Sequence, residues 1–296
     1  MELKQKQKLI KKQFELEKNY AQQILKSEKN SLARKNLIAR AYCDVTNIIY
    51  QYNPHQAYSR FNEFTTALVK KNLPIKKNVR VLDFGCGDGE LVLSLNKNNV
   101  DAYGFDVSEN SIREAQKKLA VINKEKNVFH GDFNQIQENF DLIIMDNVIE
   151  HLVPDELPAI ISKCHELLNN QGILLIITPH PFSGPHDISN EFLPLGAKAQ
   201  GLHLKEYKLE ELKDVLEQNN FSALYGYGMH PRILNKLNVI FKASTFGLKK
   251  SLWLENFFGK NLRFIFNINR NLSRLLNALL FPNIIIAKKH ENLTNK

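Results

Sequence analysis

From residue 79 onward, short apolar runs alternate with stretches of helical periodicity. The predicted strands are 80–84, 102–105, 128–129, 142–145, 173–177, 222–227 and 284–288, and the predicted helices are 89–95, 109–123, 156–168 and 209–218. Strands that alternate with helices favour a parallel sheet with helices on both faces. The sequence therefore predicts an α/β, Rossmann-like fold.

The segments around this alternating region differ from it in composition. Residues 1–74 are rich in Lys, Glu and Gln, and helical spacing predicts an N-terminal helical extension with helices at 3–31, 31–50 and 56–71, the second capped by Ser31. Residues 75–291 form the predicted α/β domain. A basic amphipathic helical insertion at 232–282 precedes its last strand.

The net charge of +9 is concentrated in two flanking segments. Residues 1–50 carry eleven Lys/Arg against five acids, and residues 232–281 carry nine against Glu255 alone. Basic residues among many Phe and Leu suit an anionic membrane surface or a lid over a hydrophobic substrate. An ordinary helical lid is the alternative, and such sustained apolarity makes a nucleic-acid partner less favoured.

Three scattered cysteines, Cys43, Cys86 and Cys164, predict no disulfide framework. No apolar run approaches the ~18 residues that span a bilayer, and the first residues lack the pattern of a secretory signal. We therefore expect a cytoplasmic protein, peripheral to the inner face of a membrane if the insertion binds lipid.

The strongest local motif follows the first predicted strand. Asp83 is followed by glycines at alternate positions, Gly85, Gly87 and Gly89. Glycine lets the backbone turn sharply and approach a ligand. The third glycine comes two residues after the second, whereas a dinucleotide-binding loop places it three after, so an NAD-dependent dehydrogenase is disfavoured. An acid before the first glycine is placed to pair with a cationic group.

Two further motifs end the next two strands. Asp106 lies 23 residues beyond Asp83, where a carboxylate can accept both hydroxyls of a ribose. Asp132 can accept from an adenine amino group while Phe133 lies against the ring. Alternatively, Asp132 is only a helix cap or turn residue.

Together these motifs resemble the class I S-adenosylmethionine (SAM)-dependent methyltransferases over residues 79–291. The resemblance implies a seven-stranded sheet whose last strand is antiparallel. It also implies SAM as the cofactor, held by Asp83, Gly85, Cys86, Gly87, Gly89, Asp106, Val107, Asp132, Phe133 and Asp146.

A second segment, residues 141–152, is similar to the E-x-x-E-H segment of ubiquinone-biosynthesis O-methyltransferases and small-RNA 3′-end methyltransferases. Glu150 and His151 are in place, Asn147 replaces the first acid, and His203 matches the downstream histidine. The resemblance implies a Mg²⁺ or Mn²⁺ site at Glu150, His151 and His203. Without a metal, His151 serves as a pocket base, or the pair is structural.

We therefore expect transfer of the SAM methyl group to an oxygen or nitrogen, with Glu150, His151 and His203 as the catalytic residues. The expected acceptor is a hydroxyl of a small molecule, a lipid-linked molecule or a glycan. Rival hypotheses are an RNA methyltransferase and an inactive methyltransferase fold that serves as a membrane scaffold. His180 and His186, in the loop after residue 177, are candidates for the rim of the pocket, but the favoured interpretation is that each is an ordinary loop histidine.

Overall fold

A computed structural model of the chain describes residues 2–53, 59–72, 79–227, 243–258, 271–272, 275 and 283–289. The chain divides into two compact units. Unit 1 comprises Met1–Phe140 with Gln200–Leu204, and unit 2 comprises Asp141–Ala199 with Lys205–Lys296.

The strands form one seven-stranded sheet in the order β3-β2-β1-β4-β5-β7-β6. Their bounds are β1 Arg80–Phe84, β2 Asp101–Asp106, β3 Val128–His130, β4 Phe140–Asp146, β5 Leu168–Ile177, β6 Phe221–Gly226 and β7 Ile284–Lys289. β2 pairs in parallel with β1 and β3, whereas β7 runs antiparallel to β5 and β6. The predicted fold class and the reversed last strand are confirmed.

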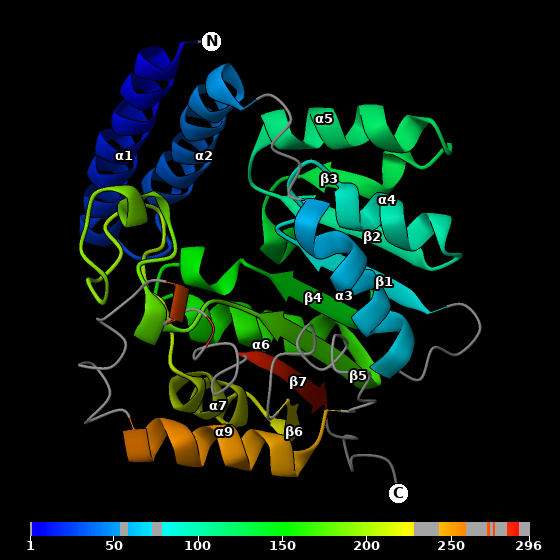
Figure 1. Cartoon of the computed structure of the whole chain (residues 1–296). Coiled ribbons are helices and arrows are strands. Elements are labelled where there is room, and N and C mark those ends of the chain that lie inside the picture. The colour runs from blue at the N-terminus through cyan, green and yellow to red at the C-terminus, as the bar shows by residue number, and fades with distance from the viewer. Residues whose placement is uncertain are drawn as a thin grey trace, which may run out of the picture. The chain divides into compact units, whose positions relative to one another are not determined.

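Unit 1 carries the N-terminal helices and the first βα repeats. Its helices are α1 Leu3–Lys26, α2 Leu32–Tyr52, α3 Ser59–Asn72, α4 Glu90–Lys97 and α5 Glu109–Ala120. α1 and α2 lie side by side and bury Phe14, Tyr20 and Ile24 of the narrow apolar stripe of α1 (Figure 1). The predicted cap is confirmed, because the Ser31 hydroxyl accepts from the Arg34 N–H at 3.1 Å.

Unit 2 carries α6 Leu157–Leu167, α7 Leu209–Gln218 and α9 Thr245–Phe258. β5 begins at Leu168, five residues before the predicted start at residue 173. The prediction missed this first half because residues 169–171 are polar. α9 is the described helix of the predicted insertion and packs against β6 and α7 (Figure 1). Most of 232–282 lies outside the described residues. Every described helix is too short or too polar to cross a bilayer.

Candidate functional site

The glycine loop joins β1 to α4 in unit 1. Gly85, Gly87 and Gly89 have φ angles of 78°, 52° and 77°. This left-handed region is costly for residues with a Cβ, so all three positions favour glycine on conformational grounds. A Cβ on Gly89 would also lie 2.7 Å from the Cβ of Ala115 in α5. The loop is thus fixed by backbone conformation and by close packing of α4 on α5. Asp83, which precedes it, is buried at the end of β1.

Backbone hydrogen bonds hold the loop against β2. The N–H groups of Gly85 and Cys86 both donate to the Phe105 carbonyl, at 2.7 and 2.9 Å. A Cβ on Gly104 would lie 2.7 Å from the Cys86 sulfur, so the loop can pack on β2 only with glycine at position 104. Gly104 was not predicted from the sequence to have this role. Burial raises the pKa of Cys86 well above its usual value, which keeps the thiol neutral.

Asp106 ends β2 and braces the same loop. Its Oδ2 accepts from the Gly87 N–H at 2.9 Å, and its Oδ1 accepts from the Ser108 N–H at 2.7 Å. Burial raises the pKa of Asp106 above its usual value, although both backbone donors oppose this shift. Each carboxylate oxygen has a second acceptor site, which suits the predicted bond to two ribose hydroxyls. Val107, beside it, is half-buried.

Asp132 and Phe133 already have protein contacts. Asp132 caps a short 3-10 helix, Phe133–Gln135, by accepting from the Asn134 N–H, and it pairs with Lys35 of α2 at 2.6 Å. Burial acts to raise the pKa of Asp132, but Lys35 and Asn134 outweigh it and hold the pKa below its usual value. The Phe133 ring is buried edge-on against Phe84, with centroids 4.4 Å apart. The cap alternative thus has direct support, and the adenine contacts stay predictions.

The second predicted segment follows β4 in unit 2. The φ of Asn147 is +55°, a region that asparagine tolerates better than most residues, and its amide donates to Asp146 Oδ1 at 2.7 Å. Next comes a short 3-10 helix, Ile149–His151, in which the Glu150 side chain is fully buried. Thr178, after β5, donates its hydroxyl to Glu150 Oε2 at 2.9 Å. This contact fixes the carboxylate before any ligand arrives.

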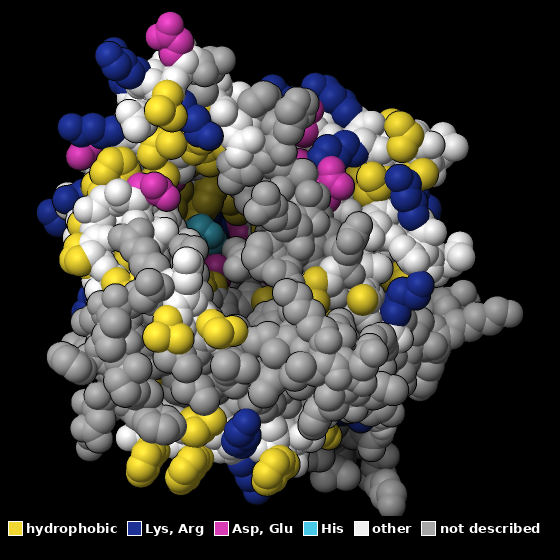
Figure 2. All heavy atoms as spheres, in the orientation of Figure 1, with side chains coloured by type: hydrophobic (Ala, Val, Ile, Leu, Met, Phe, Trp, Pro, Cys, Tyr) yellow, Lys and Arg dark blue, Asp and Glu magenta, His cyan; other side chains and the backbone are white. Residues whose placement is uncertain are grey.

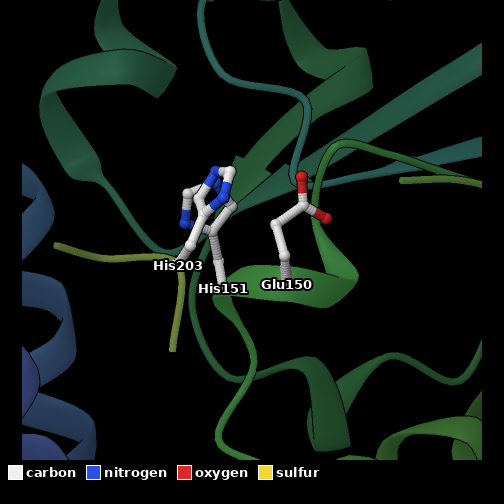
Figure 3. Close-up of side chains that lie close together, drawn as sticks. All are labelled: Glu150, His151 and His203. Atoms are coloured by element: carbon white, nitrogen blue, oxygen red, sulfur yellow. The ribbon is translucent and has the colours of Figure 1, made fainter. Parts of the chain in front are cut away.

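His203 joins this segment. One ligand atom each of Glu150, His151 and His203 lies within 4.8 Å of the others. Figure 3 shows the two imidazoles side by side, with the carboxylate next to them. The three residues therefore lie close together, and their catalytic and metal-binding roles stay predictions.

Two hydrogen bonds hold the loop segment that carries His203. The Lys205 N–H donates to the Glu150 carbonyl at 3.1 Å. On the other side, the Leu202 N–H donates to the buried Glu17 carboxylate of α1 at 3.1 Å. The N-terminal extension therefore helps to place His203, a role that no local sequence signal indicated.

His180 is buried, which favours the loop-histidine interpretation over a place at the rim of a pocket. Its Nδ1 accepts from the Phe182 N–H, so the other ring nitrogen, Nε2, carries the proton and donates to Glu255 of α9 at 2.6 Å. Burial lowers the pKa of His180, although Glu255 opposes this. A neutral histidine paired with an ionised glutamate satisfies this geometry.

Glu255 also caps α7. Its carboxylate accepts from the N–H groups of Leu209 and Glu210, both at 3.0 Å. Burial acts to raise the pKa of Glu255, but His180 and these two donors hold it below its usual value. His186, the other suggested rim residue, is half-buried and bonds to Glu206 through its backbone N–H at 2.8 Å and its ring at 3.2 Å. These carboxylates hold the loop after β5.

Comparisons with known proteins agree with this fold. A family model described as a methyltransferase domain matches residues 55–225, more than half of the chain. The ubiquinone biosynthesis O-methyltransferase of Pelagibacter ubique is 26% identical over 198 residues, which covers 63% of this chain and 80% of that protein. The enzyme of the same name from Mesorhizobium japonicum is 30% identical over 105 residues, covering 34% of this chain and 41% of that protein.

A solved structure supports the same fold. Phosphoethanolamine N-methyltransferase 2 of Haemonchus contortus, solved in complex with S-adenosyl-L-methionine, has a TM-score of 0.54 at 17% identity, covering 90% of this chain and 62% of that chain. The seven-stranded sheet, the left-handed glycine loop with Asp106, and the family match over more than half of the sequence lead to one conclusion. The chain belongs to the class I SAM-dependent methyltransferases.

Proposed function

We propose that the enzyme transfers the SAM methyl group to a hydroxyl of a small-molecule, lipid-linked or glycan acceptor. The observation that carries this proposal is the convergence of Glu150, His151 and His203. An acceptor hydroxyl needs a group that takes its proton, and an imidazole does this near neutral pH. The name of the Pelagibacter ubique relative, an O-methyltransferase, supports oxygen as the acceptor atom.

In the proposed reaction, the acceptor oxygen attacks the methyl carbon as the carbon–sulfur bond of SAM breaks. The hydroxyl proton passes to His151 or His203, and S-adenosylhomocysteine leaves. Thr178 keeps the Glu150 carboxyl group in one orientation, so its position beside the imidazoles is fixed. Most of the rate enhancement would come from holding donor and acceptor in line.

The same three side chains fit a divalent cation. One carboxylate and two imidazoles are a donor set that suits Mn²⁺ better than Mg²⁺, which prefers oxygen ligands. We propose that Glu150, His151 and His203 hold such an ion when it is bound. It would lower the pKa of a coordinated hydroxyl and orient that group. Asn147 offers a neutral amide where the related metal-binding segments have an acid, which weakens the site.

A mass comparison identifies the acceptor. Extracts and lipids from cells with and without the protein are incubated with purified enzyme and SAM labelled in the methyl group. We expect a product in which the labelled methyl group replaces the hydrogen of a hydroxyl compound, with the corresponding gain in mass. Label in RNA alone would replace the proposal with a nucleic-acid substrate, and label on nitrogen would correct the acceptor atom.

Variants then separate the roles within the cluster. His151→Asn and His203→Asn should each lower turnover by roughly 10²–10⁴-fold, the range for a lost acid–base group, with SAM affinity unchanged. His165→Asn, which changes a half-buried histidine of α6, is the matched control. If EDTA abolishes turnover and Mn²⁺ restores it, the metal proposal stands. Full activity in EDTA rejects the metal and leaves the imidazoles as bases.

A further inference from the structure

α9 has one buried face and one exposed face. Leu248, Ser251 and Leu254 are at most 7% exposed, and this face packs on β6 and α7. Phe246, Trp253 and Phe257, on the other face, are 76%, 60% and 58% exposed. Their spacing of seven and then four residues aligns them along one side of the helix. At ~1.5 Å per residue, this row of aromatic rings is roughly 16 Å long.

The charged residues of α9 are also divided between its two faces, with the lysines exposed and the acid buried. Lys249 and Lys250 are exposed among the aromatic side chains. Glu255, the one acid in α9, is buried against His180 and the first turn of α7. Figure 2 shows the result along its lower edge, where apolar side chains alternate with basic ones over α9. The exposed face of this helix therefore carries positive charge only.

We propose that α9 lies flat on an anionic lipid bilayer, with Phe246, Trp253 and Phe257 inserted at the level of the headgroups. Trp253 and Phe257 are stacked, with ring centroids 5.2 Å apart and planes 13° apart, and together present a broad apolar surface. Aromatic rings of this kind favour the membrane interface. Lys249 and Lys250 can extend their alkyl chains along the apolar layer and place their ammonium groups on lipid phosphates.

Charge and geometry favour a bilayer over a folded partner. An exposed helix face that combines large aromatics with lysines, and that has no acid, matches a continuous surface of negative charge. α9 has 14 residues, fewer than the ~20 needed to span a membrane, so it lies in the interface plane. The attachment is reversible and weakens as salt rises. It does not depend on which acceptor the enzyme methylates.

The chain carries its own reporter for this proposal, because Trp253 is its only tryptophan. Intact protein is titrated with vesicles of phosphatidylcholine alone and with vesicles that also contain phosphatidylglycerol. We expect Trp253 emission to shift to shorter wavelength with the anionic vesicles, and brominated acyl chains to quench it. The shift should be reversed by high salt and be small or absent with phosphatidylcholine alone.

Matched variants locate the contact. Lys249→Gln with Lys250→Gln should weaken vesicle binding about 25-fold, from roughly fivefold per lysine. Lys97→Gln with Lys126→Gln removes two exposed lysines of unit 1 and serves as the control. Phe246→Ser with Phe257→Ser should also weaken binding, unlike Leu3→Ser with Val121→Ser at residues 72% and 74% exposed.

Three results would overturn the proposal. Trp253 emission that does not change with either vesicle type removes the lipid surface as the partner and leaves a protein partner for this face. Equal binding to neutral vesicles removes the role of the lysines. Binding that survives unchanged in both α9 variants places the lipid contact elsewhere on the chain. SAM binding is measured in parallel, so that failure here is distinguished from failure of the enzyme.

Discussion

The glycine loop and the loop after β5 are stabilised in different ways. The glycine loop is held by backbone groups: three glycines with left-handed φ, N–H donors to Phe105, and Asp106 bonded to two further N–H groups. The loop after β5 is held by buried side chains, of which His180 with Glu255 is the central pair.

The difference shows where each region is specified in the sequence. Gly87 and the Asp106 carboxylate that it bonds are 19 residues apart and belong to consecutive βα units. His180 and Glu255 are 75 residues apart. A local motif therefore encodes the first region, whereas the second depends on residues that lie far apart along the chain.

The largest loss of stability is expected in the loop after β5, which buried side chains hold. Glu255→Ala leaves His180 and two N–H groups of α7 without their buried acceptor, and should lower the free energy of unfolding by about 3–5 kcal/mol. Urea denaturation followed by circular dichroism measures this. Glu255→Gln keeps one acceptor oxygen and should cost less. A loss below about 1 kcal/mol in Glu255→Ala would show that side chains do not stabilise this region.

The pair of Glu255 and His180 also makes the free energy of unfolding depend on pH. The pKa of Glu255 is below its usual value in the folded protein, so its ionisation stabilises the fold above the unfolded pKa of about 4.3. That stability is lost as pH falls through the lower folded pKa. Urea denaturation between pH 3 and 6 should therefore show that the free energy of unfolding falls less steeply with falling pH in Glu255→Gln than in the intact protein.

The next largest loss of stability is expected in the glycine loop. Gly89→Ala meets both an unfavourable φ and the Ala115 Cβ at 2.7 Å, and should lower the free energy of unfolding by roughly 2–5 kcal/mol. Gly131→Ala, a position with positive φ and open space, is the control that lacks the crowding. Equal losses in the two variants would mean that packing of α4 on α5 contributes nothing.

Asp106 tests the cofactor contact itself. Asp106→Ala should weaken SAM binding by roughly 1.5–3 kcal/mol, the range for hydrogen bonds to charged groups, because the ribose acceptor and the brace on Gly87 are both lost. Calorimetric titration measures this affinity. Asp106→Asn retains one acceptor oxygen, so its affinity for SAM should lie between those of the intact protein and of Asp106→Ala. Unchanged affinity in a folded Asp106→Ala protein would remove this residue from the cofactor site.

The smallest effect is expected at Lys35. Its pair with Asp132 is partly exposed, so Lys35→Met should change stability and SAM affinity by about 1 kcal/mol or less. If Asp132 accepts from the adenine amino group, the affinity should rise slightly as the competing ammonium is removed. Arg113→Met breaks a comparable surface pair with Glu109 as a control. A tenfold loss of affinity would instead mean that Lys35 itself contacts SAM.

Sequence reasoning was most successful where structure is local. The strand set, the antiparallel last strand and the need for glycine at 85, 87 and 89 follow from periodicity, family resemblance and backbone conformation. The start of β5 was missed because polar residues conceal it. The pairing of His180 with Glu255 was not predicted, since nothing near His180 in the sequence indicates Glu255. Glu17 and Thr178 were missed for the same reason, as their partners lie far along the chain.

The most direct test of a backbone-built cofactor site is a calorimetric titration of the intact protein with SAM, in EDTA and again with Mn²⁺. The loop is complete without any ligand from Glu150, His151 or His203. We therefore expect one SAM per chain and the same affinity in both buffers. No binding in either buffer, or binding that appears only with the metal, would contradict a cofactor site formed by the glycine loop and Asp106.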